Sequence, residues 1–156
     1  MAEELIKTQI VSLWKDYIYP NILEALDKSP ADRLDWAPAD KMIELGNLFL
    51  HIAECSDWWY SEVMLKQESA ELAVAGRPCP EKDIIRKHLE DHQRRMLELF
   101  SASDESLAEE YIIEGKSQVH KFKGAWIYVH VIEHDIHHRS QINQYLRILR
   151  IDPPEI

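Results

Sequence analysis

The strongest constraint on the fold is a helical repeat of apolar residues that recurs in four long stretches of the chain. In the first stretch, Ile6, Ile10, Leu13 and Ile18 follow one another at the spacing of one helix face. Only 4 glycines occur in 156 residues, too few for a turn-rich β fold. The sequence therefore predicts an all-α fold, a four-helix bundle. The four predicted helices span residues 2–27, 40–67, 81–100 and 124–150.

The length of the chain predicts a single domain over residues 1–156, built around one hydrophobic core. The first connection, residues 29–38, is short, and short connections place successive helices side by side and antiparallel. Residues 101–123 form the least regular part. There the segment Ser103-Asp104-Glu105-Ser106 can cap a short helical turn, and the rest is expected to be a loop long enough to cross the bundle.

The charge balance argues against nucleic acids and anionic membranes as partners. The formal net charge is −10 and no basic stripe interrupts it, so the surface repels phosphate groups. No stretch approaches the ~20 apolar residues that span a bilayer, and the N-terminal segment lacks the pattern of a signal peptide. The two cysteines, Cys55 and Cys79, show neither metal-binding nor disulfide spacing. A cytoplasmic protein is therefore expected.

Histidines cluster in the fourth predicted helix. Because residues four apart share a helix face, His130, His134 and His138 form one stripe. On a helical wheel His134 and His138 fall near the core direction, whereas Asp135 points outward. Two buried imidazoles one turn apart need partners, and such a pair is well shaped to bind a metal ion. The alternative is a pair of core histidines that hydrogen-bond to side chains of other helices.

His51 is the third candidate ligand. It lies midway along the second predicted helix, on the shoulder of the apolar stripe, at a height that could match His134 and His138. The alternative interpretation is that His51 is a histidine at the boundary of the core and binds no metal ion. His88 and His92 are also four residues apart, but the charged residues around them indicate a solvated helix face.

Two segments, LFLHIAE at residues 48–54 and HDIHHRSQI at residues 134–142, resemble the DinB-like superfamily of bacterial metalloproteins. The family pattern is a histidine in the second helix and H-x-x-x-H-R-x-Q-I in the fourth. The resemblance implies a four-helix bundle with up-down-down-up order, often dimeric, and a metal ion held by three histidines. These ligands map onto His51, His134 and His138.

The resemblance also implies a divalent metal ion, and imidazole suits zinc, nickel and iron alike. Characterised relatives include enzymes that use low-molecular-weight thiols. We therefore expect a homodimeric metal-dependent hydrolase or thiol S-transferase that acts on a small molecule, with such a thiol as a candidate substrate. Glu54 and Glu133 are candidates for orienting the ligands or transferring protons, their alternative being surface charges. Two other classes stay open: a non-catalytic metal- or small-molecule-binding stress protein, and a helical interaction module with structural histidines.

Overall fold

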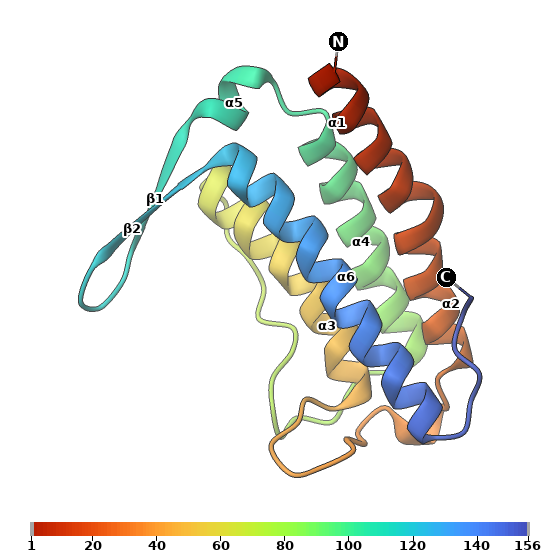
Figure 1. The fold of residues 1–156 in the computed structure, drawn as a ribbon. Helices are drawn as coiled ribbons and strands as arrows, with labels where there is room; N and C mark the ends of the chain where they lie inside the picture. Colours follow the sequence, from red (N-terminus) through yellow and green to blue (C-terminus); the bar gives the residue numbers. More distant parts are fainter. Residues whose placement is uncertain (1, 156) are drawn as a thin grey trace.

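The computed structural model describes residues 2–155, which form four long helical rods (Figure 1). The first rod consists of α1 (Ala2–Leu13), a π-helical segment (Trp14–Ile18) and α2 (Tyr19–Lys28). Pro20 follows the π-helical segment and has no N–H to donate to the carbonyl four residues earlier. The N–H of the preceding residue donates to the carbonyl five residues earlier, at the start of the segment. A wider helical turn thus accommodates the proline without ending the rod.

The other three rods follow the predicted helices closely. The second rod joins α3 (Leu45–Ser56) to a π-helical segment (Asp57–Met64), the third is α4 (Lys82–Phe100), and the fourth is α6 (Gly124–Ile148). The predicted second helix starts at residue 40, but α3 begins later. The reason is that Lys41 adopts a left-handed backbone conformation, with φ of 67°, which a right-handed helix excludes. The all-α class is confirmed.

The rods are arranged so that α4 and α6 separate the first rod from α3. In Figure 1 the first rod runs downward, α3 and α4 run upward, and α6 runs downward. Both α4 and α6 pack against α2 and against α3. The expectation that the first two helices are neighbours is therefore wrong: they are antiparallel but lie diagonally across the bundle. The connection between them extends to residue 44, which makes it long enough to reach the diagonal position.

The connection that runs the length of the bundle is residues 65–81, between the parallel rods α3 and α4 (Figure 1). The predicted crossover at residues 101–123 is therefore wrong. This segment joins the end of α4 to the start of α6 at the same end of the bundle, and the two helices run in opposite directions (Figure 1). It contains α5 (Asp104–Ala108) and the strands β1 (Glu110–Glu114) and β2 (Val119–Lys123).

The two strands form an antiparallel hairpin in which Tyr111 pairs with Phe122, where the sequence predicts a loop. Each strand has only 5 residues and mixes charged with apolar side chains, so its periodicity is weak. The predicted cap is confirmed, since Oγ of Ser103 accepts a hydrogen bond from the N–H of Ser106 at 3.2 Å. At Gly124 a Cβ atom would overlap the carbonyl oxygen of Ser106, so glycine permits the start of α6 to contact α5.

Apolar side chains from all four rods meet in one core. Fully buried members include Trp14 from the first rod, Phe49 from α3, Leu89 from α4 and Ile142 from α6. Packing of α3 against α6 turns their inner faces toward each other, and the candidate site lies between them. Among residues 2–155, none of the helices has both the length and the hydrophobicity that crossing a bilayer requires.

Candidate metal centre

The structure brings His51 of α3 together with His134 and His138 of α6. The Nε2 atom of His134 lies 3.2 Å from Nε2 of His51 and 3.1 Å from Nε2 of His138. The ring centroid of His51 is 4.8 Å from that of either partner. His134 and His138 share a face because they are one helical turn apart, and the packing of α3 on α6 supplies the third ring. This three-histidine group could hold a metal ion.

Hydrogen bonds on the outer side of two rings direct their Nε2 lone pairs inward. Nδ1 of His51 lies 3.3 Å from Oε2 of Glu54, and Nδ1 of His138 lies 2.7 Å from Oε1 of Gln141. A carboxylate and an amide carbonyl accept hydrogen bonds, so each Nδ1 donates its proton and each Nε2 keeps a free lone pair. The Nε2 of His134 can donate to only one of these lone pairs. The lone pairs of His51 and His138 thus converge beside Nε2 of His134, an arrangement that suits a divalent cation.

Burial keeps two of the rings neutral. Burial, followed by the neighbouring rings of His138 and His51, lowers the pKa of His134 to about 2. Burial also lowers the pKa of His138 to about 4, and the hydrogen bond to Gln141 opposes part of this effect. Both imidazoles are therefore uncharged at neutral pH, which is the form that binds a metal ion.

Glu54 contacts both a histidine and the long connection. Its Oε2 lies beside Nδ1 of His51, while its Oε1 accepts a hydrogen bond from the N–H of Leu72 at 3.0 Å. Leu72 belongs to residues 65–81, so Glu54 holds this connection against α3 next to the histidines. Because both of its oxygens are engaged, Glu54 is placed to orient His51 rather than to carry protons to and from a substrate.

Glu133, the other candidate carboxylate, is not brought to the three histidines. Its side chain is 66 % exposed, and its Oε2 lies 3.6 Å from Nδ1 of His130. It lines a different, apolar groove together with Ile132 and Ile136. One residue along a helix turns the side chain by about 100°, so Glu133 and His134 leave α6 in different directions.

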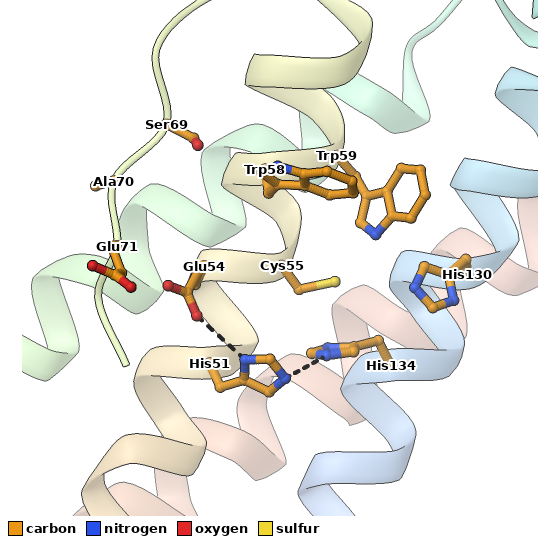
Figure 2. Close-up of a pocket in the computed structure, with 10 residues that line it drawn as sticks. All are labelled: His51, Glu54, Cys55, Trp58, Trp59, Ser69, Ala70, Glu71, His130 and His134. Atoms are coloured by element: carbon orange, nitrogen blue, oxygen red, sulfur yellow. Dashed lines mark hydrogen bonds and ion pairs between the residues drawn. The ribbon is translucent and has the colours of Figure 1, made fainter. Parts of the chain in front are cut away.

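A pocket of about 500 Å³ opens beside the histidines (Figure 2). His51 and His134 lie on one side of it and Trp58 and Trp59 on the opposite side, so a small molecule in the pocket would reach the histidines. Cys55 lines it as well. Burial foremost, followed by nearby carboxylates, raises the pKa of this thiol far above neutral. Burial thus favours the protonated thiol in this wall residue.

His130 belongs to the aromatic wall of the pocket. Its ring stacks on that of Trp126 at 4.7 Å and meets the edge of Trp59 at 5.4 Å. Burial lowers its pKa, against the opposing effect of Glu133. His137, by contrast, is exposed. Of the four histidines in residues 130–138, only two thus join the group with His51.

Two residues predicted to face solvent are buried instead. The side chains of His92 and Asp135 are 0 % and 1 % exposed. Oδ2 of Asp135 accepts a hydrogen bond from Nε1 of Trp14 at 2.7 Å and lies 2.8 Å from Nε2 of His92. Nδ1 of His92 lies 2.8 Å from Oγ of Ser56. This network reaches all four rods, and Asp135 directly follows the candidate ligand His134.

Both errors have a physical reason. The helical wheel assigns one buried face to α6, but this helix packs against α2, α3 and the segment Trp14–Ile18, so a second face is covered. For His92 the spacing contained a usable signal, because it lies three residues after Leu89 and four before Met96, which are fully buried. The charged neighbours of His92 in the sequence obscured that spacing.

The fold and the site define the class: helical-bundle proteins with a three-histidine group that could hold a metal ion between two helices. Within that class the chain belongs to the DinB superfamily, whose sequence model matches residues 17–142. This confirms the resemblance seen in the sequence.

Two solved structures are similar to this chain over most of their length. A DinB-like protein from Bacillus subtilis is 19% identical with a TM-score of 0.67, and the match covers 94% of this chain and 96% of that one. A DinB-like protein from Bacillus cereus is 18% identical with a TM-score of 0.71, covering 94% and 95%. At these identities the likeness shows the fold. No match was found among curated protein sequences.

Proposed function

We propose that this protein is a metal-dependent enzyme that acts on a small molecule in the pocket beside the three histidines. The observation that carries the proposal is the convergence of the Nε2 atoms of His51, His134 and His138 at the side of that pocket. These residues would hold one divalent ion, with zinc, nickel and iron as candidates. Three neutral ligands leave a coordination position open, which is the pattern of catalytic rather than structural sites.

Each of these ligands has a defined task. His134 and His138 would bind the ion from one turn of α6, and His51 would supply the third ligand from α3. Glu54 keeps the proton of His51 on Nδ1, and Gln141 does the same for His138. Such outer hydrogen bonds fix the ring orientation and make the inner nitrogen a better ligand.

Of the two reactions expected, thiol transfer is favoured by the position of the carboxylates. When bound, a divalent ion in this site would supply the charge that ionises a thiol or a water molecule near neutral pH. Hydrolysis gains further from a general base within hydrogen-bond reach of the attacking water. Of the two carboxylates expected to act there, Glu54 has both oxygens engaged and Glu133 lies outside the pocket. Glu71 lines the pocket, but within residues 2–155 its carboxylate forms no hydrogen bond or ion pair with the three histidines. An ionised thiol attacks an electrophilic carbon without such a base, and the leaving group departs as the S–C bond forms.

Two measurements test the proposal. Elemental analysis of untagged protein purified without nickel resin should find one divalent ion per chain. A panel of esters and electrophiles, with and without an added thiol, should then reveal thiol-dependent turnover that His134→Ala abolishes. Protein without stoichiometric metal would overturn the metal centre and leave the histidines structural. Metal without turnover across the panel would overturn the enzyme and indicate a non-catalytic binding protein.

A further inference from the structure

The pocket beside the histidines has negative charge in its walls but no positive charge. Two carboxylates line it, those of Glu54 and Glu71, whereas no lysine or arginine does. Pockets that bind carboxylates or phosphates usually present a cationic side chain, because an anion taken from water needs a countercharge. The walls of this pocket supply none.

Glu71 is the carboxylate available to a ligand. It lies on the connection 65–81, next to Glu54 on the same side of the pocket (Figure 2). The hydrogen bond from the N–H of Leu72 to Glu54 fixes the backbone beside Glu71. The oxygens of Glu54 are occupied by that bond and by His51, while the side chain of Glu71 is exposed.

Two indole rings form the side of the pocket opposite His51 and His134. The ring centroids of Trp58 and Trp59 are 4.6 Å apart, with an angle of 78° between the ring planes. The centroid of Trp59 also lies 5.4 Å from that of Trp126. Trp58 is half-buried and is seen edge-on in Figure 2, so a face of its ring is turned toward the space above the histidines. The face of an indole carries negative electrostatic potential and attracts cations.

We propose that the molecule that fills this pocket carries a positive charge, an ammonium or quaternary ammonium group held between the indole of Trp58 and the carboxylate of Glu71. The inference rests on the proposed function in that the reacting end of this molecule would face the three histidines. Among thiols and electrophiles, this pocket would therefore prefer those that carry a positive charge. Apart from the metal ion proposed at the histidines, an anionic group on the ligand would meet two carboxylates and no cationic wall residue, which disfavours it.

The test compares three probes of nearly equal shape on the zinc-loaded full chain. Choline is cationic, 3,3-dimethylbutan-1-ol is its neutral carbon isostere, and 3,3-dimethylbutanoate is anionic. Tryptophan fluorescence and isothermal titration measure their dissociation constants. Choline should bind about tenfold or more tightly than the neutral isostere. On zinc-free protein, where no metal ion can bind its carboxylate, the anion should bind more weakly than either. Equal binding of choline and its isostere, or preferred binding of the anion to zinc-free protein, would overturn the proposal.

Variants locate the effect in the pocket. Glu71→Gln should weaken choline about threefold to tenfold and leave the neutral isostere unchanged, and Trp58→Leu should remove most of the preference for the cation. Glu68→Gln is the matched control, because Glu68 lies on the same connection and is exposed but does not line the pocket. If Glu68→Gln weakened choline as much as Glu71→Gln, general surface charge would explain the preference and the pocket assignment would be wrong.

Repeating the titrations on zinc-free protein separates this inference from the proposed function. Choline selectivity in a chain that takes up no metal would support the cation pocket while the metal enzyme fails. Stoichiometric zinc and turnover without any preference for choline would support the enzyme while the cation pocket fails.

Discussion

The imidazole of His92 and the carboxylate of Asp135 form a fully buried pair, with Nε2 2.8 Å from Oδ2. The pair joins α4 to α6. Trp14 extends it to the first rod and Ser56 to α3, so one polar network connects all four rods within the core. Because His134 immediately precedes Asp135, this network also holds the backbone of α6 at the candidate metal centre.

Replacing His92 by leucine should lower the free energy of unfolding by about 3 kcal/mol. The reason is that the buried carboxylate of Asp135 would lose this partner and keep only Trp14. Urea denaturation monitored by circular dichroism measures the change in the free energy of unfolding. His88→Leu is the control on the same helix, since His88 is only half-buried, and its effect should stay below about 1 kcal/mol. Similar losses in the two variants would show that the pair does not stabilise the fold.

Removing the imidazole of His134 should abolish stoichiometric metal binding, because its Nε2 is the atom closest to both other rings. His137→Ala is the matched control: this histidine lies on the same helix but is exposed and should keep full metal content. Inductively coupled plasma mass spectrometry of both variants reads the outcome directly. Full metal content in His134→Ala would show that the ion lies elsewhere.

Changing Glu54 to glutamine should weaken metal binding roughly 10- to 100-fold, because an amide orients and polarises His51 less well than a carboxylate does. It should also loosen the connection 65–81, since Oε1 of Glu54 accepts the hydrogen bond from Leu72. Competition with a chromogenic chelator gives the affinity, and hydrogen exchange gives the protection of the Leu72 amide. Glu133→Gln, at the exposed carboxylate, should leave both readouts unchanged. A comparable loss of affinity there would mean that Glu54 has no special role.

The metal-free protein should become less stable as the pH falls below about 6.5. Burial foremost lowers the folded-state pKa of His134 to about 2 and that of His138 to about 4, whereas both titrate near 6.5 when unfolded. Between these values the unfolded chain binds more protons, so the free energy of unfolding rises with pH and this contribution is complete only above the unfolded pKa. Each group adds a slope of at most ~1.4 kcal/mol per pH unit.

Urea midpoints of the metal-free protein at about pH 7 and about pH 5 measure this dependence. His134→Ala lacks one of the two titrating groups, so its stability should change less between the two conditions. A pH dependence as steep as that of the parent chain would show that the ring of His134 is protonated in the folded state.

Local patterns in the sequence were sufficient for features that depend on near neighbours in the chain. The spacing of apolar residues predicted α4 and α6 almost to their ends, and Ser103 predicted its own cap. The same logic identified His134 and His138 as a pair, because two residues one turn apart share a helix face wherever the helix lies. The hairpin at β1 and β2 was missed because its stability comes from pairing between two short strands, neither of which has a strong pattern alone.

Tertiary packing decided everything that depends on which helices meet. Periodicity shows that a helix has an apolar face but not how many partners cover it, so Asp135 and His92 were placed in solvent although their helices are packed on more than one side. The contact between α3 and α6 decided that the ring of His51 reaches those of His134 and His138, and that Glu133 does not. A site assembled from two helices far apart in sequence depends on their packing geometry, which neither helix encodes by itself.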